Sequence, residues 1–413
     1  MTLDANDGKI HGRDIICFAN DWDSDPLSKK HIMLELSKRN RILWVNSIGT
    51  RAPQVSTRDF RRAFSKLRKF LGGCQRQSEG LYLFSPLAVP FHGSRTAQWI
   101  NRHWLPWSLR RTLRRLDFRN PITWTFLPTS TDVVGCLGEQ IVIYHCVDEF
   151  SEFTGTNRAA LLEMERRLIQ KADLVIVSSD RLYETKRQHN PNTFLVRHGV
   201  DVEHFQKACS PATIVPPDLV ALRSPVIGFH GLVADWVDLE LIRFLASARP
   251  QWSFVLIGKL ETNTEPLRCL SNVHLLGKKE YDLLPAYCKG FDVAILPFVL
   301  NDLTLAANPL KLREYLAAGL PVVASAIPEA TKLGNGVRLG VSYGHFLEQI
   351  ETLLVEGRRG PDLTISRTMD SHSWEARVSD LCSLVSSVRP GMERKESLTR
   401  VLPGFRESCS EKA

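Results

Sequence analysis

The sequence contains no run of about 20 uncharged apolar residues, the length that a helix needs to cross a bilayer. Residues 1–14 are polar and lack the apolar stretch of a secretory signal. The nine cysteines show no CxxC or CxxH spacing, and their number is odd. These absences argue against an integral membrane protein, an exported protein, a disulfide framework and a zinc site. A reducing cytoplasm is therefore the expected location.

Acidic residues are scarce in two stretches of a chain whose net charge is +8. Residues 51–76 hold eight lysines and arginines against one acid, and residues 95–119 hold seven against one. Apolar residues recur between them at helical spacing, which predicts basic amphipathic helices over 58–71 and 95–119. Such helices suit an anionic membrane surface. Alternatively, both pack an apolar stripe onto a sheet and leave their arginines in solvent. We expect no nucleic-acid partner, since no recognised module accompanies the charge.

At 413 residues the chain exceeds what one hydrophobic core usually organises, so two domains are expected. Short β-rich runs alternate with helical stretches in both halves of the chain. This alternation predicts an α/β protein with two facing doubly wound, Rossmann-like domains and a cleft between them. The expected boundaries are 1–206 and 225–372 for the domains, 207–224 for a linker, 373–388 for a helix that could cross back, and 389–413 for a flexible tail.

The most informative segment is FDVAILPFVLNDLTLAANPLKLREYLAAGLPVVAS, residues 291–325. We expect a buried strand that ends at Pro297, followed by a polar loop that carries Asp302 and Asn308. A helix is expected to start around Pro309, because proline suits the first helical turn. The free N–H groups and positive dipole of a helix start can bind a phosphate.

Lys311 and Glu314 are three residues apart and project from one face of this helix. The carboxylate can accept hydrogen bonds from the two hydroxyls of a ribose, and the lysine can offset diphosphate charge. An ordinary surface ion pair is the alternative. The sequence implies no metal, since paired carboxylates at a strand end are limited to the loosely spaced Asp21 and Asp23.

The same segment resembles the donor-binding motif of the two-domain glycosyltransferase fold called GT-B, particularly the large retaining group known as family 4 or group 1. Four further pieces agree in order: KADLVIVSSDRLYETK from Lys171, HGVDVEHF from His198, PVIGFHGLVADWVDLELI from Pro225 and HSWEARVSDL from His372. The resemblance spans most of the chain. It implies that Glu314 holds the donor ribose and that the loop beginning at Gly231 and Leu232 lies against the diphosphate.

The chain departs from the family pattern in two places. The family usually has a second glutamate eight positions before the ribose carboxylate, where this chain has Ala306. Asp302 or Asn308 could take over its contact with the donor sugar. An Arg and a Lys that often bind phosphate after the first strand of the second domain are also missing, so Lys259, Lys311 and backbone N–H groups are the remaining candidates.

In the first domain, IYHCVDEFSEF places His145 and Asp148 just past a strand that faces the cleft. Related enzymes carry a His or Asp here near the reacting sugar, where it can bond a hydroxyl or stabilise charge at the anomeric carbon. We expect Asp148 to do so because it stands further beyond the strand. His145 is either catalytic or a buried core histidine.

The expected function is transfer of a sugar from a nucleoside diphosphate sugar, a donor substrate and not a cofactor, to a lipid-linked or glycan acceptor. The reaction would serve bacterial surface polysaccharide biosynthesis at the inner face of the cytoplasmic membrane, with the acceptor on the first domain. Two alternatives share the fold. One is a sugar-nucleotide epimerase, and the other is a catalytically silent nucleotide-binding subunit, which is considered because position 306 holds alanine.

Overall fold

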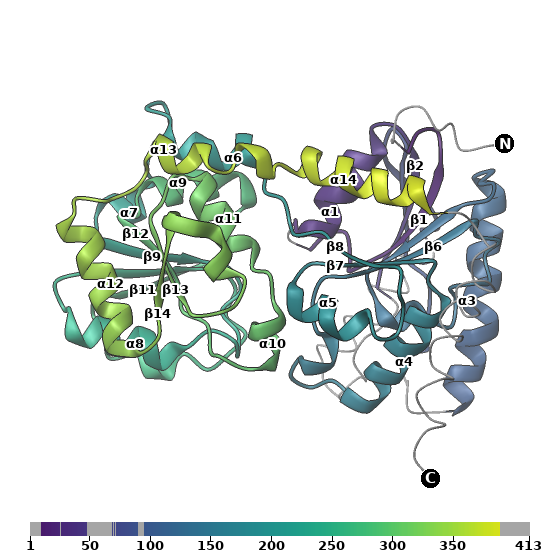
Figure 1. Ribbon diagram of the computed structural model, residues 1–413, viewed down its shortest axis with the longest axis horizontal. Helices are drawn as coiled ribbons and strands as arrows, with labels where there is room; N and C mark the ends of the chain where they lie inside the picture. Colours follow the sequence, from purple (N-terminus) through teal and green to yellow (C-terminus); the bar gives the residue numbers. More distant parts are fainter. Residues whose placement is uncertain are drawn as a thin grey trace, which may run out of the picture.

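The computed structural model describes residues 10–24, 26–47, 68, 70, 72–89 and 95–388. Within these ranges the chain forms two domains, each built on its own largely parallel sheet (Figure 1). The predicted doubly wound α/β architecture is confirmed. The tail predicted over 389–413 and nearly all of the basic helix predicted over 58–71 lie outside the described residues.

The first domain contains an eight-stranded sheet in the order β3-β4-β2-β1-β5-β6-β7-β8, parallel except for the β3–β4 pair. Its central strands are almost wholly apolar and buried, because helices cover both faces. The strands are β1 (Asp14–Phe18), β2 (Arg41–Val45), β3 (Gln75–Ser78), β4 (Leu81–Phe84), β5 (Ile122–Thr125), β6 (Ile141–Cys146), β7 (Leu174–Val177) and β8 (Thr193–Leu195). The helices are α1 (Ser28–Ser37), α3 (Arg95–Arg115), α4 (Arg158–Lys171) and α5 (Asp180–Lys186).

The second domain contains a six-stranded, all-parallel sheet in the order β11-β10-β9-β12-β13-β14. Its strands are β9 (Val226–His230), β10 (Ser253–Ile257), β11 (Val273–Gly277), β12 (Val293–Leu296), β13 (Val322–Ser325) and β14 (Val337–Gly340). Its helices are α6 (Val202–Gln206), α7 (Pro217–Val220), α8 (Leu239–Ala248), α9 (Leu284–Lys289), α10 (Asp302–Ala306), α11 (Leu310–Ala317), α12 (Tyr343–Val355) and α13 (Leu363–Arg367). The stretch 207–224, expected as a linker, packs onto this domain instead: Leu219 of α7 is buried in its core.

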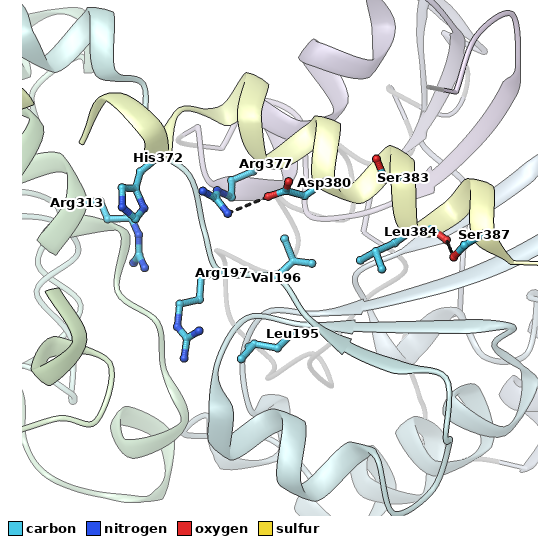
Figure 2. A pocket seen from close by; sticks show the side chains of 10 residues that line it. All are labelled: Leu195, Val196, Arg197, Arg313, His372, Arg377, Asp380, Ser383, Leu384 and Ser387. Carbon is cyan, nitrogen blue, oxygen red and sulfur yellow. Dashed lines mark hydrogen bonds and ion pairs between the residues drawn. The ribbon is translucent and has the colours of Figure 1, made fainter. Parts of the chain in front are cut away.

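The last described helix, α14 (Trp374–Ser387), returns to the first domain and lies beside α1 (Figure 1). The ring of Trp374 stacks on His31 of α1 at 5.3 Å, and Val378 and Leu381 join the apolar core beneath that helix. The Val200 N–H donates to the His372 carbonyl at 2.9 Å, so two chain segments run side by side between the domains. A pocket opens between α14, β8 and α11 (Figure 2).

The strand order reverses between β1 and β5 in the first sheet and between β9 and β12 in the second. At such a reversal the connections leave toward opposite faces of the sheet, and ligands bind in the crevice at the carboxyl ends of the strands. In the second sheet this crevice is bordered by the loop that begins at Gly231 and by the start of α11. The topology therefore brings two segments singled out in the sequence to one place.

Helix α3 packs on the first sheet through Leu105, Leu109 and Leu113, which are all buried. Its opposite side exposes 64% of Trp99 and 52% of Trp107. The helix also carries exposed arginines at positions 102, 110, 111, 114 and 115. Neither α3 nor any other helix in the described part of the chain has the length and apolar character needed to span a bilayer.

Candidate active site

The candidate donor site begins with a close approach between Gly231 and Lys311. Gly231 follows β9 with φ of +145°, and its N–H donates to the Ile257 carbonyl at 2.8 Å. A Cβ atom at Gly231 would stand 2.8 Å from the Cε atom of Lys311. The lysine side chain therefore runs directly over this glycine, where any other residue would displace it.

Glu314 lies one turn beyond Lys311 on α11 and is only 8% exposed. Burial raises the pKa of its carboxyl group, and the charge of Lys311 opposes this shift. Among the described residues, the basic group within ion-pair distance is His230, whose Nδ1 is 3.9 Å from Oε2. Burial lowers the His230 pKa to about 3, so this imidazole is neutral. A buried carboxylate without a charged neighbour in contact is available to bond a polar ligand.

Tyr315 fixes the end of β9 to α11. Its hydroxyl donates to the His230 carbonyl at 3.2 Å and accepts from the His230 N–H at 2.8 Å. The tyrosine is completely buried, and its ring meets the imidazole edge-on at 4.7 Å. The strand that leads to Gly231 and the helix that carries Glu314 are thus held as one rigid unit.

Three further residues were expected at the donor phosphates. Pro309 is buried and caps α11 with an extended backbone, so the helix begins one residue later than predicted. Leu232 is half-buried next to Gly231. Lys259 is engaged elsewhere, because 61% of its side chain is exposed and its ammonium group pairs with Glu261. Of the two candidate lysines, only Lys311 lies over the glycine loop.

The segment expected to replace the missing family glutamate does not form an open polar loop. It folds into the short helix α10, which Asn301 and Thr304 close with a capping box. Ala306 is buried, and its carbonyl accepts a hydrogen bond from the Ser179 hydroxyl of the first domain at 2.6 Å. This position therefore contributes a backbone contact between the domains.

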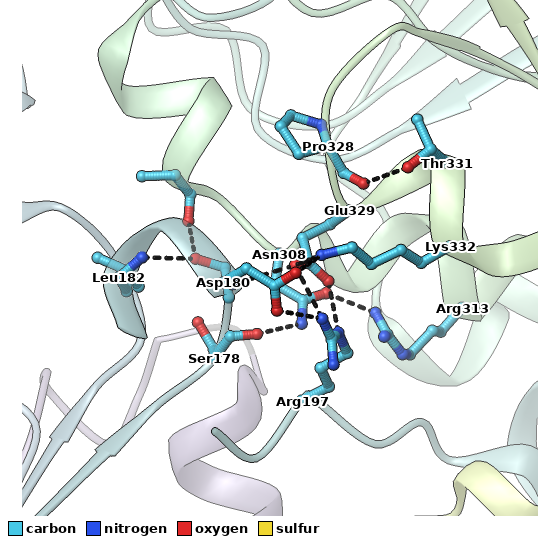
Figure 3. Close-up of polar contacts among 12 residues, drawn as sticks. Ser178, Asp180, Leu182, Arg197, Asn308, Arg313, Pro328, Glu329, Thr331 and Lys332 are labelled. Carbon is cyan, nitrogen blue, oxygen red and sulfur yellow. Dashed lines mark hydrogen bonds and ion pairs between the residues drawn. The ribbon is translucent and has the colours of Figure 1, made fainter. Parts of the chain in front are cut away.

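Asp302 and Asn308 also take part in contacts between the domains. The Asp302 carboxylate accepts from Arg181 at 2.5 Å. The Asn308 amide donates to the Ser178 carbonyl at 2.6 Å and accepts from Arg313 at 2.5 Å (Figure 3). Both ends of the buried Asn308 amide are therefore occupied. Each of the two residues suggested as sugar ligands therefore has a hydrogen-bond partner in the first domain in this structure.

Asp148 reaches the site from the first domain, two residues after β6. Burial raises the pKa of its carboxyl group, and Lys29 and Lys311 each oppose the shift. One of these lysines belongs to the same domain and the other to the facing domain. The carboxylate thus lies within electrostatic range of the lysine that covers Gly231, which brings the two halves of the candidate site together.

His145 lies within β6 and not beyond it, so the expected position past the strand is wrong. The side chain is 1% exposed and stacks on Phe126 at 5.0 Å, with the Trp124 Nε1 atom 3.4 Å from its Nδ1. Burial lowers its pKa to about 3. Of the two interpretations left open by the sequence, this environment is that of a neutral core histidine.

Lys29 is a site residue that the sequence analysis missed. It is 5% exposed, and its ammonium group donates to the Asn20 side chain at 2.9 Å and lies 5.4 Å from the Phe150 ring. The sequence contains a pattern that indicates the burial of Lys29, because this residue lies on the apolar stripe of α1 together with Ile32 and Met33. A lysine on the buried face of a helix needs a partner, and here Asp148 is its nearest acidic influence.

Asp21, one of the two loosely spaced aspartates, has hydrogen-bond partners within the first domain. The Asp21 carboxylate accepts from the backbone and hydroxyl of Ser47 at 3.1 and 2.8 Å. Within the residues that the structure describes, no three His, Cys, Asp or Glu side chains gather closely enough to hold a metal ion.

Comparison with known proteins gives matches for both the sequence and the fold. Residues 224–355 match the family model described as glycosyl transferases group 1. A Bacillus subtilis protein named as a teichuronic acid biosynthesis glycosyltransferase, TuaH, is 26% identical over 80% of this chain and 84% of its own.

Two solved structures have the same fold. HepE of Anabaena, in complex with UDP-glucose, covers 95% of this chain and 99% of its own, with 14% identity and a TM-score of 0.56. An E. coli structure described as trehalose-6-phosphate bound with UDP-2-fluoro glucose covers 92% of this chain and 100% of its own, with 13% identity and a TM-score of 0.62.

Two domains, each built on a largely parallel sheet, and the likeness to these solved structures identify the fold as GT-B. The family model falls on the second domain, which carries Gly231, Lys311 and Glu314. The family match on residues 224–355 and the similarity to TuaH support a glycosyltransferase of group 1, and with it a transferase activity.

Proposed function

We propose that this glycosyltransferase takes its sugar from a nucleoside diphosphate sugar and transfers it to a lipid-linked or glycan acceptor in bacterial surface polysaccharide biosynthesis. The observation that carries the donor assignment is Lys311 lying over Gly231, with the buried Glu314 one turn further on. The relatives support the same chemistry. Two related folds were solved with UDP-sugar compounds, and TuaH is named for teichuronic acid biosynthesis.

The donor would be held by its nucleotide half. Glu314 accepts hydrogen bonds from the two ribose hydroxyls, which supply the partners that its carboxylate lacks. Lys311 neutralises diphosphate charge, and the backbone after Gly231 and Leu232 together with the start of α11 after Pro309 provides N–H donors. Binding therefore replaces the desolvation cost of a buried carboxylate with charge-assisted hydrogen bonds.

Catalysis would follow from charges placed on both sides of the anomeric carbon. Asp148 stabilises the positive charge that develops on the sugar ring, and Lys311 stabilises the departing diphosphate. The charge of Lys29 opposes the rise in the Asp148 pKa and so favours the carboxylate form, which makes Lys29 a positioning residue in this scheme. Each group acts more strongly in the transition state than on the bound substrate, which is the requirement for acceleration.

The first domain would take the acceptor and rest on the inner face of the cytoplasmic membrane. Trp99 and Trp107 stand on the exposed side of α3, about 12 Å apart along the helix axis. Arg111 lies over the Trp107 ring at 5.7 Å. Indole rings among arginines match the interface of an anionic bilayer, where the ring enters the headgroup region and the cations meet phosphate.

A thermal-shift panel of nucleoside diphosphates tests the donor assignment. At a concentration of 100 times Kd, the matching nucleotide is expected to raise the melting temperature of the wild type by about 5–10 °C. Glu314→Gln should lose most of this response. Without nucleotide the variant should melt no lower than the wild type, because burial already disfavours the charged form of Glu314.

Glu240→Gln is the matched control, since this exposed glutamate of α8 pairs with Arg243 on its own helix. The control should keep the full nucleotide response. The assignment is wrong if no nucleotide stabilises the wild type, or if Glu314→Gln responds like the control.

Sedimentation with vesicles tests the membrane assignment. Wild type should bind vesicles of 70% phosphatidylcholine and 30% phosphatidylglycerol, and added salt should weaken the binding. The double variant Trp99→Ser, Trp107→Ser is expected to bind about tenfold less, because it loses both exposed rings. Ile214→Ser, which changes an 84% exposed apolar residue outside α3, should bind normally. Equal binding of the double variant would exclude α3 as the membrane contact.

A further inference from the structure

The pocket between β8, α11 and α14 opens where the domains join, apart from the candidate donor site. It has a volume of about 690 Å³, and we call it the hinge pocket (Figure 2). Three segments form it: β8 with the chain that follows, α11 of the second domain, and the returning helix α14. None of Gly231, Lys311, Glu314 and Asp148 lines it. Its lining residues are Leu195, Val196, Arg197, Arg313, His372, Arg377, Asp380, Ser383, Leu384 and Ser387.

Arg313 gives the hinge pocket a buried positive charge. The side chain is 2% exposed, and its Nη1 atom donates to the neutral amide of Asn308 at 2.5 Å. Its Nε atom is buried without a hydrogen-bond partner, and among the described residues no carboxylate lies within ion-pair distance of the guanidinium. The nearest acidic influence is Glu329, which is already bonded to Arg197 and Lys332. A buried arginine of this kind lacks its counterion.

Arg377 of α14 adds a second incompletely bonded guanidinium. Its terminal nitrogens donate to Asp380 at 2.9 Å and to the Ser371 carbonyl at 3.0 Å, while its Nε is buried without a partner. Burial lowers the pKa of His372, and the charges of Arg313 and Arg377 lower it further, so this imidazole is neutral and can donate or accept a hydrogen bond. The charged groups that line the pocket are thus three arginines and one aspartate.

We propose that the hinge pocket binds a phosphate group, with Arg313 and Arg377 as its principal contacts. A phosphate supplies the acceptor oxygens that the two unpaired Nε–H groups require and the negative charge that Arg313 lacks. Arg197 also lines the pocket, but its charge is largely neutralised by ion pairs with Glu329 and Asp180. The volume is that of a small-molecule site and exceeds the space that one inorganic anion fills.

The far end of the pocket indicates what can be attached to the phosphate. Leu384 and Ser387 lie there, along α14 beyond Asp380, while Leu195 and Val196 add apolar surface nearer to Arg197 (Figure 2). The Ser383 and Ser387 hydroxyls donate to carbonyls of α14 and can still accept a hydrogen bond. A phosphate monoester with an apolar or hydroxylated substituent would therefore fill both ends. Because its contacts come from both domains and from α14, such a ligand would also stabilise the arrangement of the domains in this structure.

Calorimetric titration of the full chain with inorganic phosphate, and separately with butyl phosphate, tests the proposal. Wild type should bind one equivalent of phosphate at constant ionic strength. Arg313→Met and Arg377→Gln should each weaken binding by about tenfold or more, because each removes a charge-assisted hydrogen-bond donor. Butyl phosphate binding more tightly than inorganic phosphate would identify a monoester as the ligand class, and equal affinities would identify the free anion.

Lys311→Met and Arg268→Gln are the controls for this experiment. Lys311 is the proposed diphosphate contact of the donor site, and Arg268 is a surface arginine whose side chain is 72% exposed. Both variants should bind phosphate as the wild type does. The proposal is overturned if the wild type binds neither probe, or if Lys311→Met abolishes binding while Arg377→Gln retains it, since the anion would then occupy the donor site. These results are independent of whether a nucleotide binds.

Discussion

Replacing Asp148 by asparagine is expected to lower the turnover number for sugar transfer by about 100-fold or more, with little change in the KM for the donor. Asparagine keeps the size of the side chain but removes the charge that is expected to stabilise the sugar in the transition state. The nucleotide contacts at Lys311 and Glu314 stay intact, so ground-state binding of the donor should persist. The measurement is the steady-state release of nucleoside diphosphate with the donor that the thermal-shift panel identifies.

Two further measurements distinguish this effect from a loss of structure. Burial raises the Asp148 pKa, so the neutral amide removes a charge that is costly to bury, whereas Lys29 loses its acidic neighbour. These two effects on stability oppose each other, so turnover is compared well below the melting temperatures of both proteins. Asp132→Asn, which changes a partly exposed aspartate paired with Arg167, should keep normal turnover. A turnover number for Asp148→Asn within threefold of the wild type would contradict the assigned role.

The pH dependence of turnover should also report the ionisation of Asp148. Because the pKa of Asp148 is raised in the folded protein, its carboxylate ionises above the ordinary aspartate value of about 3.9. The acid limb of the wild-type profile should therefore lie above that pH, and Asp148→Asn should lose it. Raising the pH should have opposite effects on turnover and on folding stability through Asp148. Protonated Asp148 is favoured by folding, so its contribution is present at low pH and is lost as the pH rises through the folded pKa.

The sheets and the placement of Lys311 and Glu314 on one helix could be predicted because local spacing encodes them. Buried runs such as 293–296 and 322–325 read as strands of a parallel sheet, since helices cover both faces. Lys311 and Glu314 share a helix face because they are three residues apart. These relationships hold within one element and do not depend on how the domains meet.

The contacts of the residues expected near the donor sugar could not be predicted, because they join segments that are distant in the sequence. Asn308 looked like a free amide in a loop, yet its partners are Ser178, 130 residues earlier, and Arg313. Ala306 replaces the glutamate that the family usually has at this position. In the structure its carbonyl accepts a hydrogen bond from Ser179 of the first domain. No local pattern announces that a residue lies at an interface. Lys29 differs from these residues because the sequence itself places it on the apolar stripe of a helix, so its burial could have been predicted.

Gly258→Ala is expected to lower the free energy of unfolding of the second domain by about 3 kcal/mol or more. Gly258 follows β10 with φ of +152°, and a Cβ atom there would stand 1.8 Å from the carbonyl oxygen of Gly231. The strained backbone and the steric conflict each cost about 1–3 kcal/mol. The conflict is with backbone, so no side-chain rotation can relieve it. The ends of β9 and β10 must separate, and the loop beneath Lys311 must move with them.

Gly344→Ala is the matched control, since nothing lies within 4 Å of a Cβ atom at Gly344 in the first turn of α12. Alanine is the better helix former, so this variant should be unchanged or about 0.5–1 kcal/mol more stable. Urea unfolding, followed by hydrogen exchange of peptides from each domain, separates the two transitions. Only the second domain should open earlier in Gly258→Ala, and its nucleotide response should fall because the phosphate loop is displaced. If Gly258→Ala unfolds at the urea concentration of Gly344→Ala and still binds nucleotide, the close approach of the two loops is not what shapes the donor site.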